Sequence, residues 1–153
     1  MKKYSSHFIL FLFISTLLTG MTACGPSDDE LMLRANIQAM RQAITEHKSN
    51  TFMKYIHKDY KSPIHNNINA LRNFVNYHLR NHRVIYIYMT DINIEIDGDT
   101  AKIIFYSGTA GGPEQIPERG RLFKVGTRWL KENGQWKVTQ AKWRPAIILR
   151  KTE

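Results

Sequence analysis

The feature that most constrains the fold is a strict alternation of apolar and polar residues near the middle of the chain. In "DINIEID" every second residue from 92 to 96 is isoleucine, and the residues between them are polar. Successive side chains of a β-strand point to opposite faces, so this pattern predicts a strand with one buried face. Asp97-Gly98-Asp99 follows, and Asp-Gly accepts the positive φ angles of tight turns. The segment therefore predicts an antiparallel hairpin, whose second strand is expected to turn inward Ala101, Ile103 and Phe105.

The residues just before this hairpin are apolar on both faces. From Val84 to Met89 no alternation is visible. Two explanations remain open at this point. Either the strand is covered on both sides, or a bulge near Met89 reverses which side chains point inward.

A second hairpin is predicted near the C-terminus, after "GTAGGPEQIPERG", which has the composition of a loop. Glu132-Asn133-Gly134 supplies its tight turn, and the last strand is expected to end before Pro145. Trp143 has the opposite parity to Trp136, which indicates either a bulge or a tryptophan on the outer face. The residues expected to point inward are Phe123, Val125, Thr127, Trp129, Trp136 and Val138.

In the part of the chain before the predicted strands, apolar residues recur at the spacing of α-helices. Ser27 can cap a helix with an acidic first turn that continues to about His47. A short second helix is predicted with Ser49 or Asn50 as its cap, and a third, after Pro63, with Asn66 or Asn67. Three helices followed by antiparallel strands indicate an α+β domain with helices on one face of a curved sheet. The core positions of the helices are expected to be Leu33, Ile37, Met40 and Ile44, then Phe52, Tyr55 and Ile56, then Ile68, Leu71, Val75 and either His78 or Leu79.

Three segments together resemble the nuclear transport factor 2-like (NTF2-like) superfamily, which includes the SnoaL-like proteins. They are "AITEHKSNTFMKYIHKDY", "INIEIDGDTAKIIFY" and "RWLKENGQWKV". The resemblance spans roughly residues 29 to 143. It implies a cone in which three N-terminal helices pack on a curved four-stranded antiparallel sheet. It also implies a choice between binding domains and enzymes of ketosteroid-isomerase, cyclase or dehydratase type.

The N-terminus has the three zones of an export signal. Lys2 and Lys3 precede the apolar segment "HFILFLFISTLL". The whole apolar run from Phe8 to Ala23 is shorter than the roughly 20 residues that a membrane-spanning helix needs. Met21-Thr22-Ala23-Cys24 resembles the bacterial lipobox, which implies that Cys24, the sole cysteine, becomes the lipidated first residue of the mature protein. The alternative is an ordinary signal peptide cut near Thr22, which would leave a free thiol.

These features predict four parts: a lipoprotein signal peptide over 1–23, a short tether over 24–29, an NTF2-like domain over 30–147 and a basic tail over 148–153. The expected location is the cell envelope, held by the lipid anchor. In a cell with two membranes, Gly25 after the cysteine resembles the pattern for the outer membrane, with the domain facing the periplasm.

Positive charge is concentrated in the last quarter of the chain. Residues 119–153 hold 10 Lys and Arg against 2 Asp and Glu, whereas residues 24–118 hold 10 against 11. Lys124 and Arg128 are expected to share one sheet face, joined by Lys137 if the hairpin is in register. This face is interpreted as a site for an envelope anion or a partner, the alternative being a solvated face. Nucleic acid is not expected, because no aromatic and basic recognition motif is present.

The predicted inner face carries no Asp or Glu, so an acid–base site would have to come from the helices or loops. The candidate catalytic residues are His57, Asp59, Tyr60 and His65, with His57 and Asp59 as an oriented base. The competing structural interpretation is that Asp59 ties a loop and Tyr60 fills the mouth of the cone with its hydroxyl in water.

His78 and His82 have the i, i+4 spacing that lets two imidazoles meet one zinc ion, but no third ligand is evident in the sequence. No metal site and no cofactor are therefore predicted.

The sequence favours a lipid-anchored binding or assembly domain without catalytic activity. Its expected partners are the membrane, reached through the anchor, and a protein, an envelope anion or a small apolar ligand. Homodimerisation through the open sheet face is a further expectation. The alternative function is that of a small-molecule isomerase, cyclase or dehydratase.

Overall fold

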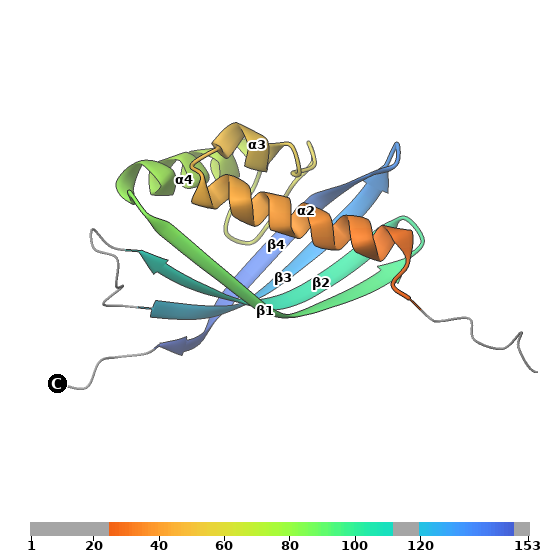
Figure 1. Cartoon of the computed structure of the whole chain (residues 1–153). Helices are drawn as coiled ribbons and strands as arrows, with labels where there is room; N and C mark the ends of the chain where they lie inside the picture. Colours follow the sequence, from red (N-terminus) through yellow and green to blue (C-terminus); the bar gives the residue numbers. More distant parts are fainter. Residues whose placement is uncertain (1–24, 112–119, 149–153) are drawn as a thin grey trace, which may run out of the picture.

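The computed structural model of the chain describes residues 25–111 and 120–148, and these form helices on one face of a curved sheet (Figure 1). All strands pair antiparallel, in the order β1-β2-β3-β4. The predicted α+β architecture is confirmed. The elements are α2 (Asp28–Thr45), α3 (Ser49–Met53), α4 (Ile68–Asn81), β1 (Ile85–Asp97), β2 (Thr100–Gly111), β3 (Gly120–Glu132) and β4 (Gln135–Ile148).

Side-chain caps fix the start of the two longer helices. The Ser27 hydroxyl accepts a hydrogen bond from the Glu30 backbone N–H (3.2 Å), and the Asn67 side chain accepts one from that of Ala70 (2.9 Å). Both caps are therefore as predicted. The cap predicted for α3 is wrong, because the helix starts at Ser49 and Lys48 precedes it without a side-chain bond.

Helix α4 buries Leu71, Val75 and Leu79. Of the two residues predicted as alternatives for the last core position, His78 and Leu79, the buried one is therefore Leu79. In α2 the buried residues are Leu33, Ile37 and Ala43, while Met40 and Ile44 pack against the core from its margin.

The first hairpin pairs Ile94 with Ile103 and Ile96 with Ala101, so residues predicted to point inward lie opposite one another. The pairing shifts between Thr90 and Asn93, where Asp91 has a φ of 53°. This bulge reverses the parity of β1, so that the partly buried side chains are 85, 87 and 89 before it and 92, 94 and 96 after it. The bulge explains the doubly apolar segment, and the covering of both faces is excluded, since Tyr88 is 67% exposed.

A second bulge resolves the parity of Trp143. Arg128 pairs with Gln140 and Trp129 with Val138, so Thr139 is the extra residue, and Trp143 returns to the inner face opposite Val125. The expectation that the strand ends before Pro145 is wrong, because β4 runs to Ile148. Pro145 is tolerated there because β4 is an edge strand and the register shifts again beside it.

Several predicted boundaries differ from the structure. Residues 108–111 and 120, expected in the loop, belong to β2 and β3. Pairing with the neighbouring strand satisfies the hydrogen bonds of their backbone N–H and C=O groups, although the glycine-rich segment has no side-chain pattern of a strand. Asp28 and Asp29, expected in the tether, begin α2, and Ile148, expected in the tail, ends β4. The signal peptide, Cys24, the middle of the predicted loop and the rest of the tail lie outside the described residues.

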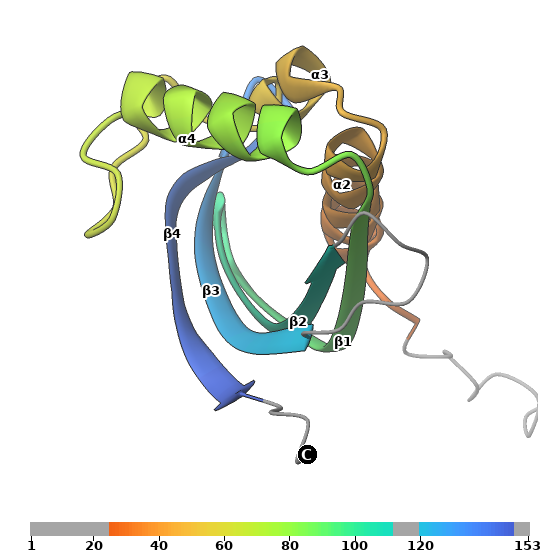
Figure 2. The same ribbon diagram turned by 90° about the vertical axis from the view of Figure 1, so that its left-hand side faces the viewer.

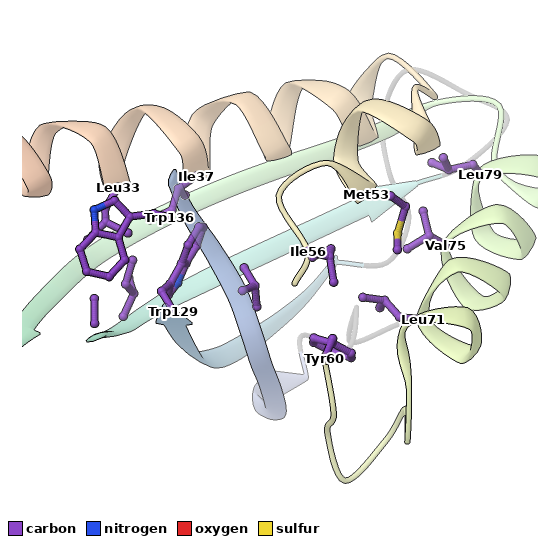
Figure 3. Packing of buried hydrophobic residues seen from close by; sticks show 13 residues of the cluster. Leu33, Ile37, Met53, Ile56, Tyr60, Leu71, Val75, Leu79, Trp129 and Trp136 are labelled. Carbon is purple, nitrogen blue, oxygen red and sulfur yellow. The ribbon is translucent and has the colours of Figure 1, made fainter. Parts of the chain in front are cut away.

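The core lies between the helices and the closed end of the sheet (Figure 3). Its cluster of buried residues runs from Leu33 to Val138, so a chain that begins at Gly25 keeps all of it. The segment after α3 completes the sheet: Ile56 bridges to Val138 in parallel, and the His57 backbone N–H donates to the Val138 carbonyl (2.9 Å). This short pairing covers part of the free edge of β4. In the described part of the chain, no helix has the length and apolarity needed to cross a membrane.

Candidate functional site

The inner face of the sheet changes from dry to solvent-accessible along the central strands. At the closed end, Ala101 pairs with Trp129 and Ile103 with Thr127, and all four are buried. The next pairs toward the open end are Phe105 with Val125 and Ser107 with Phe123, and these are only partly buried. Trp143 of β4 continues this band. We call Phe105, Ser107, Phe123, Val125 and Trp143 the mouth residues.

Helix α4 crosses above the mouth residues, and Figure 2 looks into this end of the molecule. The contact between helix and sheet is aromatic. The ring of His65, just before α4, lies 4.6 Å from that of Phe74 and 5.6 Å from that of Trp143, measured between centroids. The rings of Phe74 and Trp143 are 6.1 Å apart. The rim of the mouth is therefore built from aromatic rings and one imidazole.

Two buried polar atoms at this rim lack a hydrogen-bond partner within the described residues. They are the Tyr60 hydroxyl and Nδ1 of His65, and the two residues are 1% and 6% exposed. Ser62 lies between them: its hydroxyl accepts the His65 backbone N–H (2.8 Å), and its own backbone N–H donates to the His65 carbonyl (2.8 Å). The tight turn over residues 62–65 thus fixes His65 beside Trp143. Ser49 Oγ and His57 Nε2 are the other buried side-chain atoms without a partner in the described part of the chain. Buried polar groups normally find partners, so the two atoms in the segment next to Trp143 require an explanation.

Burial sets the protonation of these groups. It lowers the pKa of His65 below 6.5, so the imidazole stays neutral at neutral pH and keeps a free lone pair. It raises the pKa of the Tyr60 hydroxyl, which stays protonated and remains a donor. Ser62 and the Ala141 backbone oppose that rise in part, but neither makes a hydrogen bond of good geometry to the hydroxyl. The predicted wet hydroxyl of Tyr60 is therefore wrong.

His57 is held away from the mouth. It is 5% exposed, and its Nδ1 accepts a hydrogen bond from the Asp59 backbone N–H (3.1 Å). That bond uses the Nδ1 lone pair, and Nε2 lies 3.5 Å from a carboxylate oxygen of Glu132 without forming a hydrogen bond. The Asp59 carboxylate is 75% exposed and 3.8 Å from Nδ1. The arrangement ties the loop after α3 to the β3–β4 turn and does not bring His57 and Asp59 to the mouth residues.

His78 of α4 and His82, the residue that caps its C-terminus, lie side by side. The rings of His78 and His82 stack with centroids 5.6 Å apart, and burial, with the charge of His82, lowers the pKa of His78. Over residues 25–111 and 120–148, no group of three or more His, Cys, Asp or Glu side chains gathers as a metal site would require. The pair extends the aromatic rim through Phe74, whose ring is 4.4 Å from that of His78.

The outer face of the sheet carries the basic residues singled out in the sequence. Arg128 is two residues from Leu130, which pairs with Lys137, so Lys124, Arg128 and Lys137 share this face. Lys142 and Arg144 join them, and so do the three strand tyrosines Tyr86, Tyr88 and Tyr106.

Phe74 is the rim residue that sequence reasoning missed. It lies one position before Val75 of the apolar stripe of α4 and is 39% exposed, so helical spacing places it outside the core. The one feature of the sequence that could have indicated Phe74 is that it is an aromatic residue between two histidines, His65 and His78. Only the fold brings Phe74 onto Trp143, which lies 69 positions further along the chain.

Comparisons of sequence find no relative: no protein-family model matches the chain, and no curated protein is similar to it. Comparisons of structure find many. A candidate scytalone dehydratase from Novosphingobium aromaticivorans superposes with a TM-score of 0.71 at 10% identity, covering 82% of this chain and 89% of that one. A candidate dehydratase of the NTF2-like family from Streptomyces avermitilis gives a TM-score of 0.68 at 15% identity, covering 80% and 99%.

Bd1075 from Bdellovibrio bacteriovorus gives a TM-score of 0.66 at 13% identity. The match covers 74% of this chain but 39% of Bd1075, so this chain corresponds to one part of that longer protein. At these identities the comparisons show a shared fold. The chain has the NTF2-like fold, as the resemblance in its sequence implied.

Proposed function

We propose that the protein is an exported, lipid-anchored binding domain that takes a small, largely apolar ligand at its mouth residues. The observation that carries the proposal is the composition of the inner face. From the Ala101–Trp129 pair to the Ser107–Phe123 pair, its side chains on β2 and β3 are hydrocarbon or aromatic apart from Ser107 and Thr127. Lys131 lies beyond this stretch and is paired with Asp29 (2.8 Å). The Thr127 hydroxyl is already used, since it accepts the Trp129 indole N–H (2.8 Å).

The two orphan polar atoms would orient such a ligand. A planar aromatic molecule with one hydroxyl could stack on Trp143 and Phe74, donate to Nδ1 of His65 and accept from the Tyr60 hydroxyl. Ligand sites of this kind combine apolar walls with a few placed polar groups. The absence of a carboxylate on the described inner face favours binding over acid–base chemistry.

The test uses 1-naphthol as the probe, titrated into the domain over residues 25–153 and followed by two-dimensional amide NMR. Saturable shifts are expected at Phe105, Val125 and Trp143. His65→Phe should weaken binding by up to about tenfold, the effect of one lost hydrogen bond. The matched control is His47→Phe, an exposed histidine in the turn between α2 and α3, which should bind as wild type does. Shifts that are absent from the mouth residues, or equal in both variants, would contradict the proposal.

Export and anchoring are proposed from the sequence, and they are tested separately. Mass spectrometry of the protein extracted from membranes should show an N-terminal Cys24 carrying a diacylglycerol and an acyl chain. Cys24→Ala should release the domain from the membrane fraction. An unmodified thiol on the processed chain would refute the anchor and leave the ligand site untouched.

A second function, that of a small-molecule dehydratase or isomerase, is favoured by the pair His65 and Tyr60. The neutral imidazole could accept a proton from carbon, and the Tyr60 hydroxyl could donate to the oxygen that gains charge. Two of the structures with the same fold are described as candidate dehydratases.

This function is tested by exchange of the α-protons of 2-tetralone with D₂O. An enzyme would accelerate the exchange, and His65→Gln should abolish the acceleration. The double variant His57→Gln with Asp59→Asn should leave it unchanged, because neither residue reaches the mouth. No acceleration by the wild-type protein would remove this function.

A further inference from the structure

We infer that the outer face of the sheet docks flat on an anionic lipid bilayer, so that the mouth residues point away from the membrane. The inference deepens the proposed function and rests on its lipid anchor for proximity to the membrane. It is carried by two observations on the outer face, a cluster of cations and adjoining tyrosines, and by the end of the sheet from which the tether leaves the domain.

The cations form one continuous patch on β3 and β4. Lys124 pairs with Arg144 directly across the strands, Lys142 lies beside Gly126, and Arg128 and Lys137 follow toward the turn. The side chain of Lys142 passes over Gly126, whose Cβ position would lie 3.7 Å from its Cε. We call Lys124, Arg128, Lys137, Lys142 and Arg144 the cationic patch.

The cationic patch is not neutralised within the domain. Among the described residues, none of its five members takes part in an ion pair, whereas Lys102 on the neighbouring β2 pairs with Glu95 (2.9 Å). The described acid on these two strands is Glu132 at the turn, and it faces His57. Each cation close to the surface of an anionic bilayer should raise the partition coefficient of the domain about fivefold.

Tyrosines continue the face on the β1 side. Tyr88 is 67% exposed and lies opposite Gly108, which pairs in turn with Leu122. Tyr106 lies next to Lys124, whose Nζ is 5.8 Å from the centre of its ring. Tyrosine presents an apolar ring and a polar tip, which suits the boundary between head groups and acyl chains. Cations beside exposed tyrosines thus favour a lipid surface over an acidic protein.

The tether leaves the domain on the inner side of the sheet, at the end that carries the β3–β4 turn. Asp29, in the first turn of α2, forms an ion pair with Lys131 (2.8 Å) and accepts a hydrogen bond from the indole N–H of Trp136 (2.9 Å), which fixes the start of α2 beside the β3–β4 turn. From Cys24 to Asp28 the chain can span at most about 14 Å. A lipid on Cys24 would therefore hold this end of the sheet, which includes Lys137, close to the bilayer, and the charge of the outer face would set which side turns toward it.

A second copy of the chain is the competing occupant of the outer face. Two copies packed with their cationic patches against each other would bring like charges into contact, which opposes association. Glu95 of β1 also lies on the outer face, but it is already paired with Lys102. The charge pattern therefore favours the bilayer.

The experiment measures partition of the domain over residues 25–153 onto vesicles of phosphatidylcholine with 30% phosphatidylglycerol. Lacking Cys24, the domain reports on the face and not on the anchor. Binding is expected with these vesicles and not with pure phosphatidylcholine, and it should fall as salt rises. Lys142→Gln with Arg144→Gln should lower the partition coefficient by about 25-fold, as two cations at fivefold each.

The matched control removes the same charge from the opposite side: Lys54→Gln with Lys58→Gln, two exposed residues at and after α3. This variant should partition within about twofold of wild type, and thermal unfolding should show both double variants folded. Tyr88→Trp adds an optical report, since its emission should shift to the blue on anionic vesicles alone.

Equal losses in the two double variants would overturn the inference, because they would show a response to net charge and not to this face. Absence of binding to anionic vesicles would overturn it as well. So would a stable dimer in sedimentation that buries Tyr88, which would assign the face to a second copy.

Discussion

Replacing Tyr60 by phenylalanine is expected to stabilise the domain, although the residue is almost completely buried. The side chain is 1% exposed and belongs to the hydrophobic core, and its hydroxyl has no hydrogen-bond partner among the described residues. Leaving a hydroxyl buried and unpaired costs about 1–3 kcal/mol, and phenylalanine removes that cost while it keeps the ring. Allowing for the small void that remains, the free energy of unfolding should rise by about 1 kcal/mol.

For a domain of this size, about 1 kcal/mol corresponds to a rise in Tm of roughly 4 °C. Urea unfolding at pH 7 should show a higher midpoint with an unchanged m-value. Tyr88→Phe is the matched control, because its side chain is 67% exposed. It should change the free energy of unfolding by less than about 0.5 kcal/mol.

The same hydroxyl predicts a pH dependence. Burial raises the pKa of Tyr60 above 10.0 in the folded state, so above pH 10 the unfolded chain releases a proton that the folded chain keeps. Folded protein then binds more protons, and stability falls as pH rises. The advantage of Tyr60→Phe over wild type should therefore grow between pH 9 and pH 11.

A destabilised Tyr60→Phe variant would refute this reasoning, since it would show that the hydroxyl bonds to Ser62 or to the Ala141 carbonyl. If the hydroxyl instead anchors a ligand, the variant will be more stable and will bind 1-naphthol more weakly. Stability and binding would then move in opposite directions, as they do where a site keeps an unsatisfied group for its ligand.

Three further outcomes test the fold. Ile103→Ala, at a position with no exposure, should lower the free energy of unfolding by about 3 kcal/mol, whereas Leu31→Ala, at 51% exposure, should change it little; urea midpoints compare the two. Gly98→Ala meets no neighbouring atom but has a φ of +56°, so calorimetry should show a loss of about 1 kcal/mol, against none for Gly25→Ala. The hydrogen bond from Lys131 lowers the pKa of Asp29 below 3.8. The ionised Asp29 therefore stabilises the fold above pH 3.8, and this contribution is lost as the pH falls through the pKa of the folded state. The difference in urea midpoint between wild type and Asp29→Asn should be clear at pH 7 and vanish near pH 2.

The local elements of this protein follow from short stretches of sequence because their causes are local. The alternation around Ile94 with the turn at Gly98 predicts the first hairpin, and Ser27 and Asn67 predict where two helices start. Each of these signals depends on neighbours within a few positions. The wrong boundaries are of another kind: β4 passes Pro145, and β2 continues into a glycine-rich segment, because pairing with an adjacent strand decides where a strand ends.

The sequence by itself determined the class of the fold, the absence of a carboxylate on the inner face and the basic character of the last quarter of the chain, since these depend on composition and period alone. Tertiary structure decided the rest. The pairing of β3 with β4 places the bulge at Thr139 that turns Trp143 inward, and packing buries the Tyr60 hydroxyl. His57 and His65 are close in sequence, but in the fold only His65 reaches the rim. Such outcomes depend on contacts between residues far apart in the chain, and no local pattern records them.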